Sequence, residues 1–192
     1  MRRVLLLLLL AVALPATTWA KGTIDLANRG GTITGSNAGL QLTGSVLFAY
    51  GSATGTDLGT VSFTTGAFVG TGSAAMGGTL APGGTFLITG SGTNGVPSGM
   101  IFKGTFTSAT WNVITLADGS HQYTLSGAIE GNGRVGATVQ LAVVSGKGLF
   151  SGTADLSSGD TSLSVPEPGT LGLLGTGLLG MGGLMRRRLR IG

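Results

Sequence analysis

The chain has 192 residues, of which 38 are glycine and none is cysteine, and its formal net charge is +4 at pH 7. The positive charge comes from the two ends, which hold Arg2, Arg3 and the four arginines after Met185. Between residues 21 and 165, five basic side chains oppose six acidic ones, so this body carries five minus six, or −1. Such a body offers no basic surface for nucleic acid, and without cysteine it forms no disulfide. Its length predicts one domain.

The first twenty residues have the pattern of a secretory signal peptide. Arg2 and Arg3 precede an apolar run over residues 4–14, and Ala20 supplies a small residue at the cleavage point before Lys21. An uncleaved anchor is the alternative, but eleven apolar residues are too few for a stable membrane span. The residues around the arginine pair lack the twin-arginine pattern. We therefore expect export through the general secretion machinery and removal of the peptide by signal peptidase.

Residues 21–156 have the composition of an all-β domain. Short runs of β-branched and aromatic residues alternate with Gly, Ser, Asn and Asp, and no segment sustains a helical period. The predicted strands are 41–50, 59–65, 85–89, 101–107, 110–116, 122–129, 135–144 and 149–156. This pattern predicts an antiparallel β-sandwich of about eight strands. The sequence does not define how the strands before residue 101 pair.

Two tight turns organise the second half of this domain. Asp118-Gly119 and Asn132-Gly133 each separate two strand-like runs, and glycine in such turns tolerates positive φ. We therefore expect a meander from about Ile101 to Leu156. The alternation over residues 135–143 also places its larger apolar side chains on one face of a half-buried strand. These side chains are Val135, Ala137, Val139, Leu141 and Val143.

Few residues of the body have chemistry that supports catalysis. His121, the only histidine, lies beside Asp118 and Ser120, but neighbours in one turn rarely form a catalytic triad. One histidine without cysteine also fails to supply the ligands of a zinc site. Two G-x-G-x-x-G matches, at 90–95 and 131–136, are not followed by a helical pattern, so they do not predict a nucleotide site. We expect no enzyme activity and no cofactor.

Two binding alternatives remain open. Asp155 and Asp160 flank a Leu-Ser-Ser-Gly segment, where two carboxylates and backbone carbonyls could hold a calcium ion. A carbohydrate-binding module would use exposed aromatic side chains, and the candidates are Trp111, Tyr50 and Tyr123. The sequence does not place these three side chains on one surface.

Threonine pairs two residues apart occur at positions 32 and 34, 54 and 56, and 105 and 107. They resemble the pairs of ice-binding surfaces, which need many such pairs in a flat, regular array. We interpret three scattered pairs as solvent-facing strand positions, where β-branched threonine is favoured.

The C-terminal end combines several features in order. We predict that residues 157–164 form a polar linker, followed by the extended motif Val165-Pro166-Glu167-Pro168. Residues 169–185 carry no charge and would span about 26 Å as a transmembrane helix, slightly less than the roughly 30 Å core of a bilayer. A basic tail over 186–192 then holds this end in the cytoplasm and leaves the body outside. Its arginines are Arg186, Arg187, Arg188 and Arg190.

This end, over residues 165–192, closely resembles the PEP-CTERM sorting signal of Gram-negative bacteria, a tail also catalogued as an ice-binding-protein C-terminal domain. The resemblance implies that an exosortase, a membrane transpeptidase, recognises and processes the Pro-Glu-Pro motif. It also implies anchoring in the inner membrane in transit, then a place at the cell surface or outside the cell, with exopolysaccharide and biofilm. The leading hypothesis is therefore a non-catalytic surface or matrix protein. A surface-displayed carbohydrate-binding module and, less favoured, a secreted enzyme are the alternatives.

Overall fold

The computed structural model describes residues 22–144 and 148–165, in which ten β-strands and no helix are present. The strands are β1 (Gly22–Arg29), β2 (Thr32–Ser36), β3 (Gly39–Tyr50), β4 (Ala53–Thr64), β5 (Gly78–Leu80), β6 (Gly83–Ser91), β7 (Ser98–Thr115), β8 (His121–Gly131), β9 (Arg134–Val144) and β10 (Thr153–Val165). The predicted signal peptide, transmembrane helix and basic tail lie outside the described residues.

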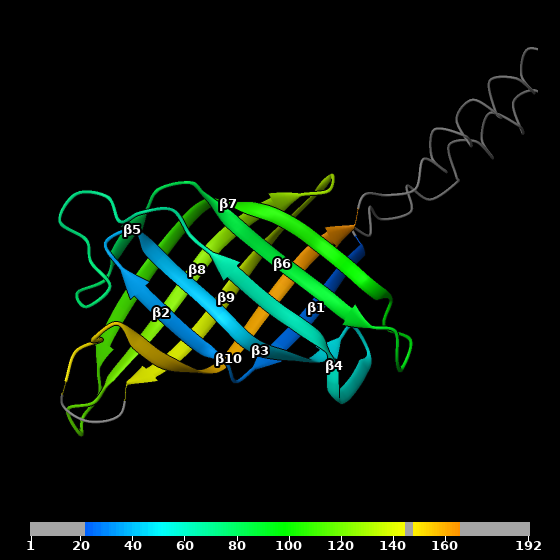
Figure 1. The fold of residues 1–192 in the computed structure, drawn as a ribbon, viewed down its shortest axis with the longest axis horizontal. Coiled ribbons are helices and arrows are strands. Elements are labelled where there is room, and N and C mark those ends of the chain that lie inside the picture. The colour runs from blue at the N-terminus through cyan, green and yellow to red at the C-terminus, as the bar shows by residue number, and fades with distance from the viewer. Residues whose placement is uncertain (1–21, 145–147, 166–192) are drawn as a thin grey trace, which may run out of the picture. The chain divides into compact units, whose positions relative to one another are not determined.

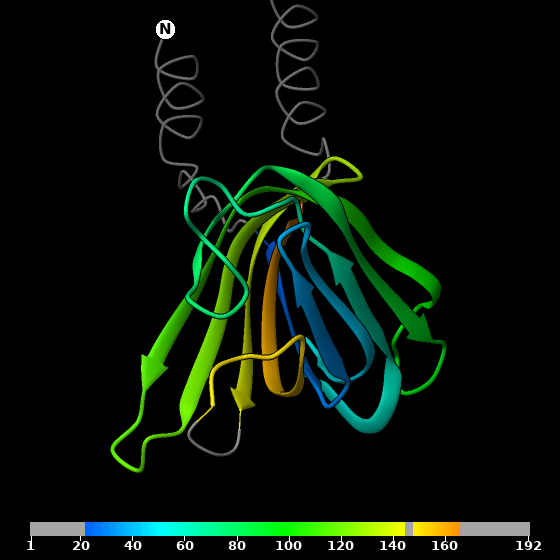
Figure 2. The ribbon, with the colours of Figure 1, turned by 60° about the vertical axis from the view of Figure 1, so that its left-hand side comes forward.

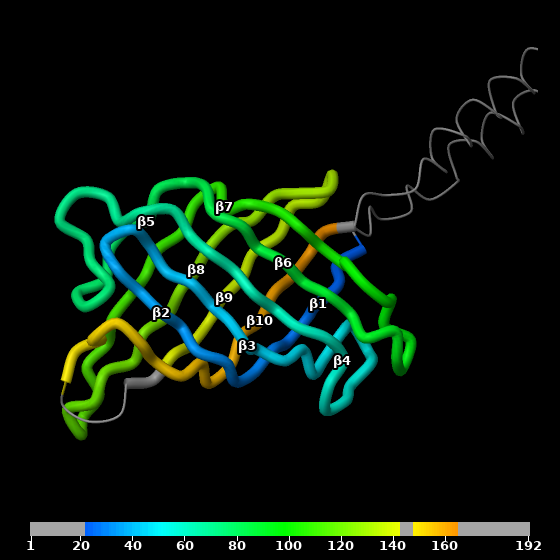
Figure 3. The backbone as a smooth tube through the Cα atoms, viewed as in Figure 1, coloured from blue at the N-terminus to red at the C-terminus, as the bar shows by residue number. Residues whose placement is uncertain are grey.

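All ten strands belong to one antiparallel sheet that closes on itself (Figures 1 and 3). The strands β2, β3, β4, β6, β7, β8 and β9 follow one another along the sheet, and the short β5 pairs with β7. β10 pairs with β9 on one side and with β2 on the other, so it joins the two ends. In both figures β2, β3, β4 and β6 pass in front of β8, β9, β10 and β1. The side chains between these two layers form the core.

β1 and β2 behave as one kinked strand at the closure. β1 ends at Arg29 and β2 starts at Thr32, and their common register with β3 continues across Gly30 and Gly31. Both glycines have positive φ, and a Cβ on Gly31 would come within 2.6 Å of the backbone nitrogen of Ser45. The close approach of β3 therefore requires glycine here. Figure 2 shows β1 and β2 (blue) between β10 (orange) and β3.

The all-β, antiparallel prediction is confirmed, but the described residues do not form the predicted two-sheet sandwich. A sandwich packs two sheets face to face, whereas this single hydrogen-bonded sheet returns to its first strands. Side chains alternate with a period of two in both architectures, so the pattern alone does not distinguish them. The meander of β7, β8, β9 and β10 is confirmed. Its tight turn at Asn132-Gly133 has φ values of 50° and 68°.

The strand boundaries differ from the predictions in three respects. β1, β2 and β5 are missing from the predicted set. Residues 101–107 and 110–116 form the single strand β7, whose register with β8 shifts between Phe106 and Ser108. Residues 157–164, predicted as a linker, belong to β10. Their Ser, Gly and Asp content is typical of a linker, but Leu163 is buried and pairs opposite Gly136 of β9.

Two aromatic clusters fill the inside of the closed sheet. In the first, the rings of Phe63, Phe86 and Phe106 have centroids 5.6 to 5.9 Å apart. In the second, Trp111 stacks on Tyr123 at 5.3 Å, and the ring of Phe150 contacts both edge to face. Edge-to-face and offset contacts of this kind stabilise a core beyond the area they bury.

The loop between β4 and β5 is bound to the second cluster. The indole nitrogen of Trp111 donates to the carbonyl of Ala74 at 2.8 Å, and the hydroxyl of Tyr123 donates to the carbonyl of Ala75 at 2.8 Å. The backbone N–H of Phe150 donates to the same tyrosine hydroxyl at 3.0 Å. The polar ends of both aromatic side chains are thus satisfied although the rings are fully buried.

A polar network lies inside the sheet where it closes. The side-chain amides of Asn28 and Gln140 hydrogen-bond to each other, with distances of 2.9 and 3.2 Å. Asn28 also donates to Ser45, Gln140 donates to Thr138, and Thr138 shares a hydrogen bond with Thr161. No buried side-chain nitrogen or oxygen of the described residues lacks a partner. This closure network therefore connects β1, β3, β9 and β10 through satisfied side chains.

Candidate functional site

The outer face of β9 is apolar, and its inner face holds two buried polar side chains. Val135 and Val139 are 50% and 46% exposed, whereas Thr138 and Gln140 are 1% and 0% exposed. Val135, Ala137 and Val139 therefore share one face, as the alternation predicts, but this face is the outer one. The inner positions belong to the closure network, whose partners come from β1, β3 and β10. Because a strand alternates with a period of two, those contacts turn Val135, Ala137 and Val139 outward.

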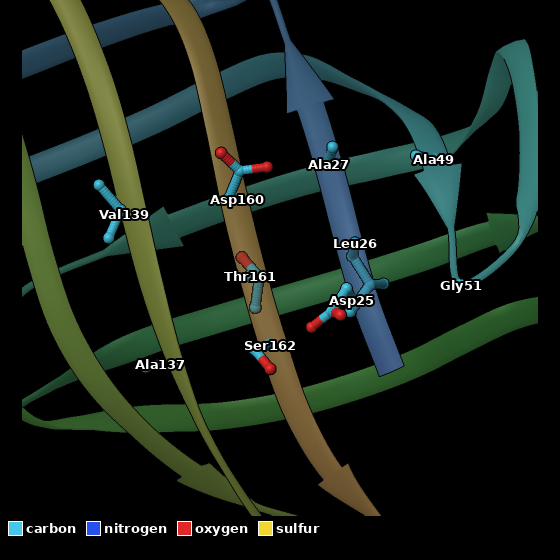
Figure 4. Close-up of a pocket in the computed structure, with 10 residues that line it drawn as sticks. All are labelled: Asp25, Leu26, Ala27, Ala49, Gly51, Ala137, Val139, Asp160, Thr161 and Ser162. Atoms are coloured by element: carbon cyan, nitrogen blue, oxygen red, sulfur yellow. The ribbon is translucent and has the colours of Figure 1, made fainter. Parts of the chain in front are cut away.

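A shallow groove of about 370 Å³ lies on the outer face of four adjacent strands (Figure 4). Its lining comprises Asp25, Leu26 and Ala27 of β1, Ala49 near the end of β3, Gly51 just after β3, Ala137 and Val139 of β9, and Asp160, Thr161 and Ser162 of β10. Val139 pairs opposite Asp160, and Ala137 pairs opposite Ser162. The small side chains of the alanines leave the hollow between the larger valine and the carboxylates.

The groove is acidic as well as apolar. The carboxylates of Asp25 and Asp160 come from the neighbouring strands β1 and β10, and both side chains are exposed. The basic side chain of β1, Arg29, lies over the ring of Phe48, 5.4 Å from its centroid. No sequence motif marks this site, since its residues come from four separate segments of the chain.

The turn before β8 and the histidine that starts this strand do not form a catalytic triad. The hydroxyl and the backbone N–H of Ser120 both donate to Oδ1 of Asp118, at 2.6 and 2.9 Å. These two hydrogen bonds, the hydroxyl one first, lower the pKa of Asp118 below its ordinary value. Nδ1 of His121 lies 3.1 Å from the hydroxyl of Thr115 across the hairpin. The serine hydroxyl therefore serves the turn and does not face the imidazole as a nucleophile would.

The calcium hypothesis for Asp155 and Asp160 is contradicted. Both residues lie on β10, where Asp155 pairs opposite Val143 and Asp160 opposite Val139. Five residues along a strand correspond to roughly 15 Å, which is too far for one ion. Among the described residues, no group of three or more His, Cys, Asp or Glu side chains could hold a metal ion.

The aromatic side chains that were candidates for sugar binding are mainly core residues. Trp111 and Tyr123 are fully buried in the second aromatic cluster, and Tyr50 is partly buried at the end of β3. A carbohydrate surface that depends on Trp111 is therefore contradicted, because a sugar ring cannot reach this indole. The sequence could not show that Trp111 is buried, because the alternation of residues along a strand is the same whichever of its two faces is exposed.

The three predicted threonine pairs lie on β2, β4 and β7, which are not neighbours in the sheet. Strand pairing instead aligns Thr34, Gln41, Thr64 and Thr85 in one row across β2, β3, β4 and β6. Part of this row lines a second, smaller hollow of about 280 Å³. Such a row appears only once the strand register is known.

Comparison with protein-family models identifies the PEP-CTERM protein-sorting motif at residues 164–188. The matched segment includes Pro166, Glu167 and Pro168, and it starts in the last two residues of β10. Searches of curated proteins and of solved structures found no match. Within 22–144 and 148–165 no helix is long and apolar enough to cross a membrane, and the predicted span at 169–185 lies outside these residues. The chain thus carries a PEP-CTERM sorting motif, and it is an exported protein that an exosortase sorts toward the cell surface.

Proposed function

We propose that this protein is a non-catalytic component of the cell surface or extracellular matrix, associated with exopolysaccharide. The observation that carries the proposal is the sorting motif at residues 164–188, which begins where β10 ends. Pro166 follows the last strand without a spacer. An exosortase that acts at this motif would release or re-anchor the folded sheet as one unit.

The polar side chains of the described residues support a structural or binding role. Every buried side-chain nitrogen and oxygen among them has a hydrogen-bond partner. His121 bonds to Thr115, and Ser120 bonds to Asp118, so neither is positioned as a base or a nucleophile. The groove across β9, β10 and β1 is open to solvent and is lined by small apolar residues and two carboxylates. These features favour contact with another molecule over chemical conversion of it.

The sorting part of the proposal is tested by the C-terminal peptide of the protein recovered from its own bacterium. Mass spectrometry should find a chain that starts at Lys21 and ends near Pro168. Replacing Pro166 and Pro168 with Ala should leave the arginine tail in place, whereas Pro97→Ala, in an exposed loop, should leave processing unchanged. A wild-type chain that still carries Arg186 would contradict processing and indicate a permanent anchor.

The matrix part of the proposal is tested by fractionation. The mature protein should sediment with the exopolysaccharide and enter the supernatant once a glycoside hydrolase has degraded that polymer. A protein that stays in the medium before and after this treatment would contradict the association. A turnover assay against broad hydrolase substrates should give no activity above that of the buffer.

A carbohydrate-binding module is the second candidate function. The open groove across β9, β10 and β1 favours it, because sugar rings present both apolar and polar faces. The buried Trp111 and Tyr123 are excluded from any such contact.

A further inference from the structure

The groove across β9, β10, β1 and the end of β3 has the size of a ligand site. Its volume of about 370 Å³ falls within the roughly 300–1,000 Å³ range of small-molecule pockets. It spans four strands that lie about 4.8 Å apart, so its long dimension is roughly 14 Å. A shallow groove of this length suits a short stretch of a long molecule, which can enter and leave at both ends.

The floor of the groove exposes apolar side chains, whereas the solvent-facing side of a strand usually carries polar ones. Ala27, Ala49 and Ala137 form its small, apolar part, and Val139 stands beside them with 46% of its surface exposed. The valine faces outward while the polar Gln140 next to it is fully buried. Exposed apolar surface above a polar interior is the reverse of the usual arrangement, and contiguous apolar surface commonly marks a contact with a partner.

The negative charge of the groove indicates which kind of partner can bind there. Asp25 and Asp160 stand on neighbouring strands at the groove, and Figure 4 shows both carboxylates beside Thr161 and Ser162 of β10. A second copy of this chain would bring carboxylates to carboxylates, and an anionic lipid surface would also be repelled. The groove is complementary to a ligand that has apolar faces and carries positive charge.

We propose that this groove binds a polysaccharide with free amino groups, as in a deacetylated amino-sugar polymer. The C–H face of a sugar ring packs on Ala137 and Val139, and the ammonium groups pair with Asp25 and Asp160. The ring hydroxyls hydrogen-bond to Ser162 of β10. This inference rests on the proposed association with exopolysaccharide and names the chemical class of the polymer.

The test compares two soluble probes of equal length, a β-1,4-linked glucosamine hexamer and its fully N-acetylated counterpart. Binding to the full-length chain in a neutral detergent is measured by isothermal titration calorimetry. The glucosamine hexamer should bind at least tenfold more tightly than the acetylated one. Asp25→Asn and Asp160→Asn should each weaken its binding by up to about fivefold, and added salt should weaken it further.

Two further variants separate the groove from general acidity. Asp155→Asn removes an exposed carboxylate from β10 outside the groove lining and should leave binding unchanged. Ala137→Phe places a large side chain on an exposed strand position and should block both hexamers. Circular dichroism should show that each variant keeps the wild-type spectrum.

Several results would overturn the proposal. These are equal binding of the two hexamers, no binding of either, or an affinity that Asp25→Asn and Asp160→Asn together leave unchanged. A lysine hexapeptide that binds as tightly, with the same dependence on both carboxylates, would show a general cation site and overturn the assignment to a glycan.

Failure of this inference can be distinguished from failure of the proposed function. A protein that sediments with exopolysaccharide but does not bind the hexamers would refute this inference alone. A protein absent from the matrix would refute the proposed function whatever the calorimetry shows.

Discussion

Replacing the buried Gln140 with Leu should destabilise the fold by about 2–4 kcal/mol, although the new side chain is apolar. Gln140 accepts one hydrogen bond from Asn28 and donates to Asn28 and Thr138. Without it, the amide oxygen of Asn28 loses its donor inside the sheet, and an unsatisfied buried group costs about 1–3 kcal/mol. The lost bond to Thr138 adds about 0.5–1.5 kcal/mol, less whatever the apolar side chain gains from packing.

This loss is large against the 5–15 kcal/mol that typically stabilises a domain. It also falls on β1, β3, β9 and β10, the strands that close the sheet, so the midpoint of unfolding should shift without a local intermediate. Urea unfolding of the mature protein followed by fluorescence measures it, since Trp111 is the one tryptophan after the predicted signal peptide. The slope of the free energy against urea should stay at its wild-type value.

A matched control and a double variant make this reasoning refutable. Gln41→Leu removes an exposed amide from β3 and should change the free energy of unfolding by less than about 0.5 kcal/mol. Asn28→Leu combined with Gln140→Leu removes both amides, so the double variant should be more stable than the sum of the single losses predicts, by about 1 kcal/mol or more. Additive losses, or a Gln140→Leu cost equal to that of Gln41→Leu, would refute the closure network as a coupled unit.

Three other predictions follow from the outer face and the turns. Val139→Thr changes an exposed side chain and should alter the unfolding free energy by less than about 0.5 kcal/mol. Thr138→Val should cost about 1–2 kcal/mol because Gln140 loses a hydrogen-bond acceptor. If urea unfolding gave the opposite order, Val139 would face inward and Thr138 outward, and our description of β9 would be wrong. Gly133→Ala should cost about 1 kcal/mol and lower the melting temperature, since its φ is 68°, and an unchanged melting temperature would refute that strain. Because Ser120 lowers the pKa of Asp118, this carboxylate contributes stability above its ordinary pKa of 3.8 and loses it as the pH falls through the lower folded value. Ser120→Ala should raise that pKa in an NMR titration, and no change would show that the hydroxyl is not its main cause.

The parts of the fold that depend on neighbouring residues were predictable. The turn at Asn132-Gly133 follows from two residues that tolerate positive φ, and β8 and β9 follow from their composition. The sorting motif at 164–188 was predictable for the same reason, because its proline pair, apolar run and arginines follow one another in a single short stretch of sequence. β10 was predictable only in its first residues, since Ser, Gly and Asp continue as a strand only when β9 supplies the partner.

The sequence by itself determined an exported all-β body with tight turns and a sorting signal at its end, because these features depend on short stretches of chain. Only the tertiary structure decided that one sheet closes through β10 and which face of β9 turns inward. It also decided that Trp111 is buried and that Asp25 and Asp160 stand at one groove. A period of two marks a strand but not its partners or its inner side. The strand partners and the inner face of β9 depend instead on contacts between distant residues, such as the hydrogen bond between Asn28 and Gln140, which are more than a hundred residues apart.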